Sequence, residues 1–99
     1  MKWLRRRGSS SSAGSGKRSE DRRYLEEFIA TRRGVEAFVE PATSVSSASV
    51  VLVAADGEWT RRSVPDAPTA FAWANKQGIP CYDVTLLGYP KRMRDWNGT

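Results

Sequence analysis

An Asp-Gly pair at positions 56 and 57 separates two runs of β-patterned residues, and no other feature constrains the fold as strongly. This dipeptide between such runs is a strong hairpin signal and favours a two-residue type I′ turn. The run before the pair, residues 49–55, is apolar on both faces, as in a central strand. The run after it, residues 58–64, carries adjacent arginines, one for each face, which is typical of a strand near an edge.

The two-residue turn also predicts which residues face each other. It places Ala54 opposite Trp59, so that the indole packs over Ala54 on one face of the sheet. Arg62 then lies on the other face, together with Val51 and Val53.

Two helical patterns and two further strand patterns surround this hairpin. Helical spacing predicts a helix over residues 20–33, with Ser19 as its N-cap, and a second helix that Asp66 caps and Gly78 ends. Alternating apolar residues predict strands over residues 35–40 and 81–87. In the second helix, the predicted buried stripe consists of small and aromatic residues: Ala67, Ala70, Phe71 and Ala74. Trp73 is predicted on the opposite side, where it either faces a partner or is covered by Met93 or Trp96 of the C-terminal segment.

These elements follow one another in the order α-β-β-β-α-β. The simplest way to bury their apolar stripes is an α+β fold, a four-stranded mixed or antiparallel sheet with both helices on one face. We expect a single domain over residues 19–96 and a flexible C-terminus over residues 97–99. The order of the strands does not follow from the sequence.

The positive charge of the chain is concentrated at its start. The net charge is +5, but residues 19–99 hold ten basic and eleven acidic side chains, a balance of −1. Residues 1–18 are Ser- and Gly-rich, a composition typical of disordered tails. They contain six basic side chains and no acid, and these are the side chains through which the chain would bind a nucleic acid: Lys2, Arg5, Arg6, Arg7, Lys17 and Arg18.

The composition excludes most familiar catalytic sites. There is no histidine and only one cysteine, so neither the usual general base nor a common zinc or haem site is available. The lone Cys81 fits a reducing compartment and is expected to be inert. The sequence also lacks a phosphate-binding loop, a secretory signal and an apolar stretch long enough to span a membrane. We therefore expect a cytoplasmic, non-catalytic protein without cofactor or metal.

Four segments carry a resemblance to a known family: LEEF (25–28), RRGVEAFVEP (32–41), DGEWTRR (56–62) and GYPKRMRD (88–95). On these segments the chain, from Tyr24 to Trp96, resembles a family of small actinobacterial proteins of about a hundred residues. The resemblance implies a bacterial cytoplasm. Some relatives carry a generic oxidoreductase label, but this sequence has no dinucleotide fingerprint and no CxxC pair to support one.

Aromatic and basic residues recur together in two parts of the chain, and this mixture is typical of binding surfaces. Three interpretations remain open: the arginines pair with Glu36, Glu40 or Glu58 across the sheet, or they bind a protein partner, or they bind RNA or DNA. We favour a protein partner, because the body has almost no net charge. The candidate binding residues are Trp59, Arg61, Arg62, Trp73, Tyr89, Lys91, Arg92, Arg94 and Trp96.

Overall fold

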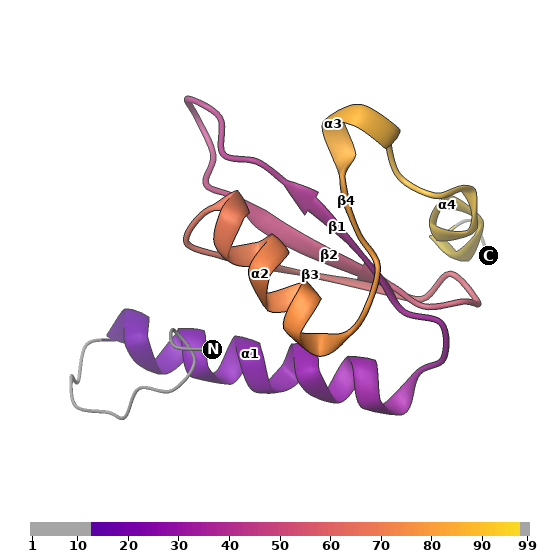
Figure 1. Cartoon of the computed structure of the whole chain (residues 1–99), viewed down its shortest axis with the longest axis horizontal. Coiled ribbons are helices and arrows are strands. Elements are labelled where there is room, and N and C mark those ends of the chain that lie inside the picture. Colours follow the sequence, from indigo (N-terminus) through magenta and orange to yellow (C-terminus); the bar gives the residue numbers. More distant parts are fainter. Residues whose placement is uncertain (1–12, 98–99) are drawn as a thin grey trace.

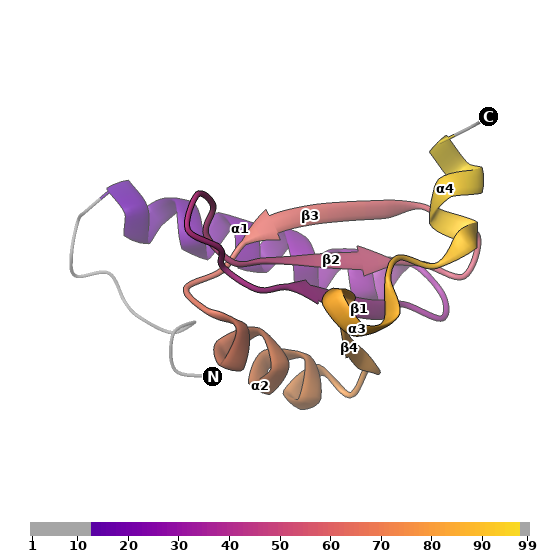
Figure 2. The ribbon, with the colours of Figure 1, turned by 90° about the horizontal axis from the view of Figure 1, so that it is seen from above.

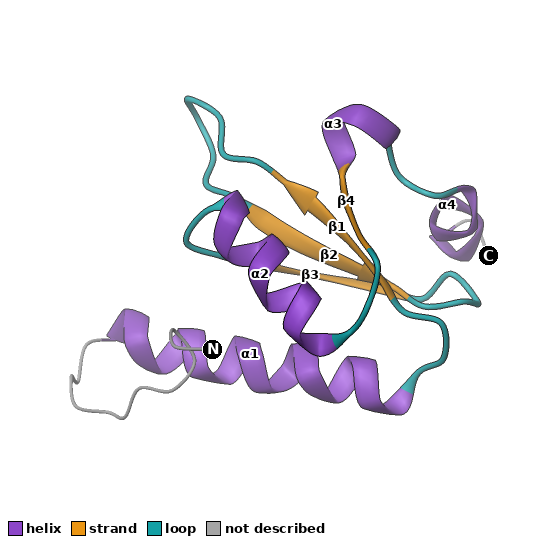
Figure 3. Ribbon diagram, viewed as in Figure 1, coloured by secondary structure: helices purple, strands orange, loops and turns teal. Residues whose placement is uncertain are grey.

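The computed structural model describes residues 13–97 of the 99-residue chain. It has the predicted α+β fold with element order α-β-β-β-α-β, followed by two short helices that the sequence analysis did not predict (Figures 1 and 3). The elements are α1 (Ala13–Thr31), β1 (Glu36–Glu40), β2 (Ser49–Val53), β3 (Trp59–Ser63), α2 (Ala67–Gln77), β4 (Cys81–Asp83), α3 (Val84–Leu87) and α4 (Lys91–Asn97).

The four strands form a mixed sheet in the order β3-β2-β1-β4. β1 pairs with β2 and β2 with β3 in antiparallel fashion, whereas β1 and β4 are parallel. A parallel pair requires a crossover between its strands, and the segment from β2 through α2 supplies it. β3 and β4 are therefore the two edges of the sheet.

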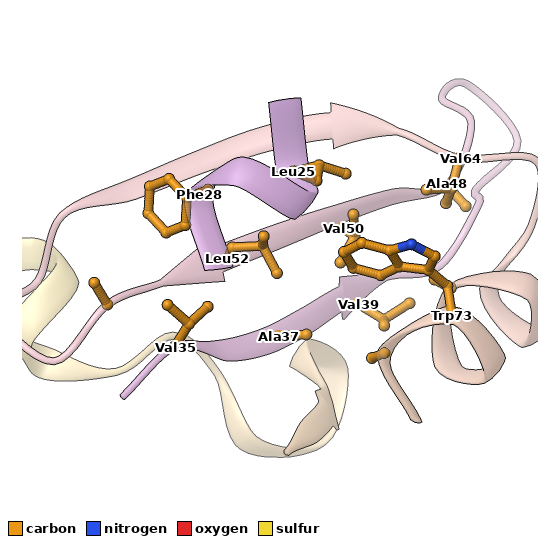
Figure 4. Close-up of a cluster of buried hydrophobic side chains, with 13 residues drawn as sticks. Leu25, Phe28, Val35, Ala37, Val39, Ala48, Val50, Leu52, Val64 and Trp73 are labelled. Carbon is orange, nitrogen blue, oxygen red and sulfur yellow. The ribbon is translucent and has the colours of Figure 1, made fainter. Parts of the chain in front are cut away.

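Both long helices cover the same face of the sheet, as predicted. Leu25 and Phe28 from α1, with Trp73 from α2, pack against one set of strand residues that includes Val50 and Leu52 (Figure 4). A second, smaller cluster lies on the other face, where Met93 of α4 contributes to the burial of strand residues. Figures 1 and 2 both show α4 beside the loop that joins β2 to β3.

The second helix has the predicted ends. The carboxylate of Asp66 accepts a hydrogen bond from the backbone N–H of Thr69 at 2.8 Å, as an N-cap does. Gly78 ends the helix in the left-handed conformation, with φ of 76°, which glycine adopts without a steric penalty.

The predicted position of Trp73 was wrong, because the structure buries this residue in the core. Its side chain is only 1% exposed and is the largest of the fully buried side chains. Trp73 follows Ala70 by three residues, so the two lie on neighbouring parts of the helix surface, about 60° apart. The indole offers far more apolar area than Ala67, so the helix turns this side toward the sheet, and Phe71 is left half-buried.

The predicted hairpin register was also wrong, by one residue. Val53, not Ala54, lies opposite Trp59. Gly57 donates its N–H to the carbonyl of Ala54 at 2.9 Å, and Ala54 donates to Glu58 at 2.8 Å, so residues 55–57 form a three-residue loop. Such loops place a residue with positive φ last, and Gly57 has φ of 101°.

A shift of one residue moves every side chain of β3 to the opposite face. Trp59 therefore packs with Val51 and Val53 rather than over Ala54. Arg62 faces α1 instead of the side that the sequence predicted. Arg61 and Trp59 share the opposite face, with Val51 and Val53.

The ends of two other elements differ from the prediction. α1 begins at Ala13, so Ser19 lies inside the helix rather than at its cap, and the predicted tail overlaps the helix over residues 13–18. An existing helix gains one hydrogen bond for each residue added, which favours such extension. Residues 1–12, the rest of the predicted tail, lie outside the described residues.

The predicted last strand ends early. β4 stops at Asp83, whose carboxylate accepts a hydrogen bond from the N–H of Thr85 at 2.8 Å and thereby caps a new helix, α3. α4 then runs to Asn97, the first residue of the predicted flexible end, while residues 98–99 lie outside the described part of the chain.

Candidate interaction surface

The sheet face that α1 and α2 leave open carries a group of aromatic side chains. Phe38 is buried there, and its ring centroid lies 5.3 Å from that of Tyr82. Trp59 and Tyr89 are half-buried against the same cluster. We call these four residues the aromatic face.

α4 is fixed against this face by two neighbouring residues. Arg92 donates from Nε to the carbonyl of Ala54 at 2.9 Å and from Nη2 to Glu36 Oε1 at 2.7 Å. Met93 is buried in the small cluster. Trp96, on the same helix, remains 42% exposed. The helix therefore holds an exposed indole in a defined position beside the aromatic face.

Arg61, Glu40 and Tyr89 form a hydrogen-bonded group at the other end of this face. Arg61 donates to both carboxylate oxygens of Glu40, from Nε at 3.0 Å and from Nη2 at 2.9 Å, and the hydroxyl of Tyr89 donates to the same carboxylate. The hydrogen bond to Glu40 raises the pKa of Arg61. The pKa of Tyr89 is raised first by burial and then by its hydrogen bond to Glu40, so the phenol stays protonated at neutral pH.

Arg62 makes its contacts on the opposite face, with α1. Its Nε lies 3.2 Å from Asp21 Oδ1, and its guanidinium carbon lies 4.2 Å from the ring centroid of Tyr24. Its Nη1 donates to Thr60 Oγ1 and to the carbonyl of Arg61. The carboxylate and the ring hold the guanidinium plane of Arg62 in a fixed orientation.

The arginines near the sheet are thus paired with carboxylates, which is one of the three interpretations that the sequence left open. Arg61 pairs with Glu40 and Arg92 with Glu36, as that interpretation requires, while Glu58 takes Arg32 of the first loop as its partner. These pairs account for the arginines without any ligand. They do not exclude a binding role, because a paired guanidinium keeps further N–H donors.

Two cavities adjoin at the end of β2 and β3. One, of about 440 Å³, lies between the β1–β2 loop and α3 and is lined by Glu40, Arg61, Tyr89 and several hydroxyl side chains. The other, of about 370 Å³, is lined by Asp21, Ser49, Arg61, Arg62 and Ser63. Ser49 and Arg61 line both cavities. We call the second one the arginine cavity.

The structure brings together part of the predicted binding set and separates the rest. Trp59, Arg61, Tyr89, Arg92 and Trp96 lie on or beside the aromatic face. Trp73 belongs to the core instead, and Arg62 faces α1. Lys91 lies 3.2 Å from Asp95 in a fully surface-exposed pair, and Arg94 is exposed on α4.

Sequence reasoning missed the partners of Arg62 on β3. Asp21 and Tyr24 are three positions apart and therefore share a helix face, which is a visible signal. That signal leads to Arg62 only when β3 has the correct register, because the predicted register turned Arg62 away from α1. The observed register also makes Ser49 and Ser63 a cross-strand pair, which the predicted register did not.

Cys81 is a poor nucleophile in this fold. Burial raises the pKa of its thiol to about 11, so at pH 8 the sulfur stays protonated. We expect iodoacetamide to alkylate the folded protein much more slowly than a free cysteine at pH 8, with a rate that increases with pH up to about 11. Because Cys81 is the only cysteine, mass spectrometry of the whole chain measures the rate directly. The same measurement in urea is the control, and equal rates for the folded and unfolded chain would contradict the burial.

Within residues 13–97, no group of three or more acidic or cysteine side chains is arranged to hold a metal ion. No helix in that part of the chain is long and apolar enough to cross a membrane. Comparison of the chain with protein-family models, curated proteins and solved structures finds no match.

Proposed function

We propose that this protein is a small, non-catalytic binding module of the cytoplasm, and that its ligand is another protein. The observation that carries the proposal is the rigid presentation of Trp96. Arg92 and Met93 fix α4 to the sheet, so the exposed indole of Trp96 projects from a backbone that is held in place. Tryptophans held in this way are frequent hot spots of protein interfaces, because little conformational entropy is lost on binding.

The pairing of the arginines supports a protein rather than a nucleic acid. Nucleic-acid binding depends on unpaired cations that replace counterions along the phosphate backbone. Arg61, Arg62 and Arg92 instead share their charge with Glu40, Asp21 and Glu36. Binding of RNA or DNA would therefore depend on the six basic side chains of residues 1–18, which lie outside the described side chains. No described residue supports the oxidoreductase alternative.

Affinity capture with the full-length chain tests the proposal. We expect the wild-type protein to capture a defined partner from a bacterial lysate after nuclease treatment, and Trp96→Ala to lose most of that capture. The substitution keeps the Cβ atom that lies near Gly57 and removes only the indole. Val45→Ala is the matched control, since Val45 is an exposed apolar residue in the distant β1–β2 loop.

A second variant distinguishes a protein partner from the alternative ligand, RNA or DNA. Replacing Arg5, Arg6 and Arg7 by glutamine removes half of the basic side chains of residues 1–18. We expect this triple variant to retain the captured protein. Capture that disappears with nuclease, or with the triple variant but not with Trp96→Ala, would refute a protein partner in favour of a nucleic acid.

A further inference from the structure

The arginine cavity has the side chains of an oxyanion site. Two guanidinium groups and two serine hydroxyls line a volume of about 370 Å³ beside the edge strand β3. Ser49 and Ser63 lie directly opposite each other on β2 and β3, and Arg61 and Arg62 precede Ser63 on the same strand. Ser49, Arg61 and Ser63 lie on one face of the sheet and Arg62 on the other, and the cavity beside the edge strand β3 reaches all four side chains.

Each arginine keeps donors for a ligand after its structural contacts are counted. Arg61 uses Nε and Nη2 for Glu40, and Arg62 uses Nε for Asp21 and Nη1 for Thr60 and the carbonyl of Arg61. Among the described residues, these contacts use neither Nη1 of Arg61 nor Nη2 of Arg62, although the hydroxyl of Tyr89 also lies within hydrogen-bonding reach of the Arg61 guanidinium. Each of these nitrogens carries two N–H groups, so the guanidinium groups together offer four donors.

Each arginine of the cavity is paired with a carboxylate: Asp21 lines the cavity itself, whereas Glu40 does not. The side chain of Arg61 is 48% exposed and that of its partner Glu40 20%, and the values for Arg62 and Asp21 are 33% and 18%. In both pairs the positive group is therefore the more accessible one. The carboxylates orient the guanidinium groups and lower their rotational freedom, which reduces the entropy lost when a ligand binds.

The formal charge of the group indicates what kind of anion it would take. Two arginines and two carboxylates sum to zero, so the group has little long-range attraction for a polyanion such as RNA. The cavity must therefore select its ligand by short hydrogen bonds to a single anionic group with several acceptor oxygens. A phosphate monoester has three acceptor oxygens and a charge of about −1.5 to −2 at neutral pH, and paired arginines bind it through parallel N–H···O bonds.

We propose that the arginine cavity binds a single phosphate monoester, carried on a serine or threonine of the protein partner. That the phosphate is carried by a protein rests on the proposed function. Whether the cavity binds a phosphate at all can be tested without that partner. The cavity has room for more than the phosphoryl group, as a site for a modified side chain requires.

The test is a titration of the ¹⁵N-labelled full-length protein with the capped tripeptide Gly-phosphoserine-Gly, its unphosphorylated form and inorganic phosphate, all at equal ionic strength. We expect the phosphopeptide to shift the amide signals of residues 61–63, and the unphosphorylated peptide to leave them unchanged. A response to inorganic phosphate of equal affinity would support the oxyanion site with the free ion as its source. A tighter response to the phosphopeptide would support the modified side chain.

Variants locate the site. Arg61→Lys keeps the charge and the pairing with Glu40 but loses the fork of donors, and we expect it to weaken phosphopeptide binding roughly tenfold. Ser63→Ala leaves both ion pairs intact and should weaken binding several-fold. Arg33→Lys is the matched control, because Arg33 is exposed after the end of α1 and does not line the cavity.

Three results would overturn the inference: equal binding of the two peptides, no response to either phosphate probe, or a loss of binding in Arg33→Lys as large as that in Arg61→Lys. These failures are distinguishable from a failure of the proposed function. If Trp96→Ala abolishes partner capture while the titration is silent, the binding module stands and the phosphate site falls. If the phosphopeptide shifts the amide signals but no protein is captured, the phosphate site stands and the proposed binding module falls.

Discussion

Trp73→Ala should lose about 3–5 kcal/mol of unfolding free energy, the usual loss when a buried tryptophan is truncated. The indole lies between α2 and the sheet, in contact with the same cluster as Leu25 and Phe28 of α1 (Figure 4). Its removal leaves a cavity where three elements meet, and the sheet cannot move to fill it. Urea denaturation of the full chain, followed by far-UV circular dichroism, measures the loss.

Two further variants make this result specific. Trp96→Ala truncates an exposed indole and should lose less than about 1 kcal/mol. Trp73→Phe should lose much less than Trp73→Ala, because Nε1 of Trp73 is buried and has no hydrogen-bond acceptor among the described residues. Equal losses in Trp73→Ala and Trp96→Ala would show that Trp73 is not part of the core.

Gly57→Ala should lower the free energy of unfolding by about 1–2 kcal/mol through backbone strain. The displacement of α4 should lower it further. Gly57 has a positive φ of 101°, and a Cβ atom there would overlap the carbonyl oxygen of Arg92 and touch Trp96. The backbone of α4 must move away, which breaks the hydrogen bond between Arg92 and Ala54. We expect a lower melting temperature and faster cleavage by trypsin within α4, at Lys91, Arg92 and Arg94.

Gly78→Ala is the matched control for this variant. Gly78 also has a positive φ, of 76°, but nothing lies within 4 Å of the position that its Cβ would take. It should show the cost of strain alone, without faster cleavage of α4. Equal destabilisation and equal cleavage in the two variants would mean that α4 does not pack closely against Gly57.

Local signals in the sequence predicted the elements well, because each depends on a few neighbouring residues. Asp66 and Gly78 mark the ends of α2 by side-chain capping and by left-handed geometry, and both are visible in one sequence. The shared face of α1 and α2 also follows from local patterns, since both apolar stripes need the same partner. The order of the strands does not, because β4 pairs with β1 through contacts that no local pattern encodes.

The candidate surface was harder to predict than the fold. Asp56-Gly57 fits a two-residue and a three-residue loop equally well, and the choice between them decides which face of the sheet carries Trp59 and Arg61 and which carries Arg62. Helical spacing alone also misplaced Trp73, because it weighs every apolar residue equally and ignores how far an indole reaches. Pairing of the arginines with Glu36, Glu40 or Glu58 was one of three interpretations that the sequence left open, and the structure pairs Arg61 with Glu40.

The parallel pairing of β1 with β4 has a consequence for how the chain folds during synthesis. β1, β2 and β3 follow one another closely and can pair early, whereas β4 joins β1 only after the whole of α2 has been made. Until α4 has also emerged from the ribosome, Phe38, Val51 and Val53 lack the cover that Met93 provides. The nascent chain therefore exposes an apolar sheet surface to other nascent chains until α4 has been translated and has packed, and this interval favours aggregation.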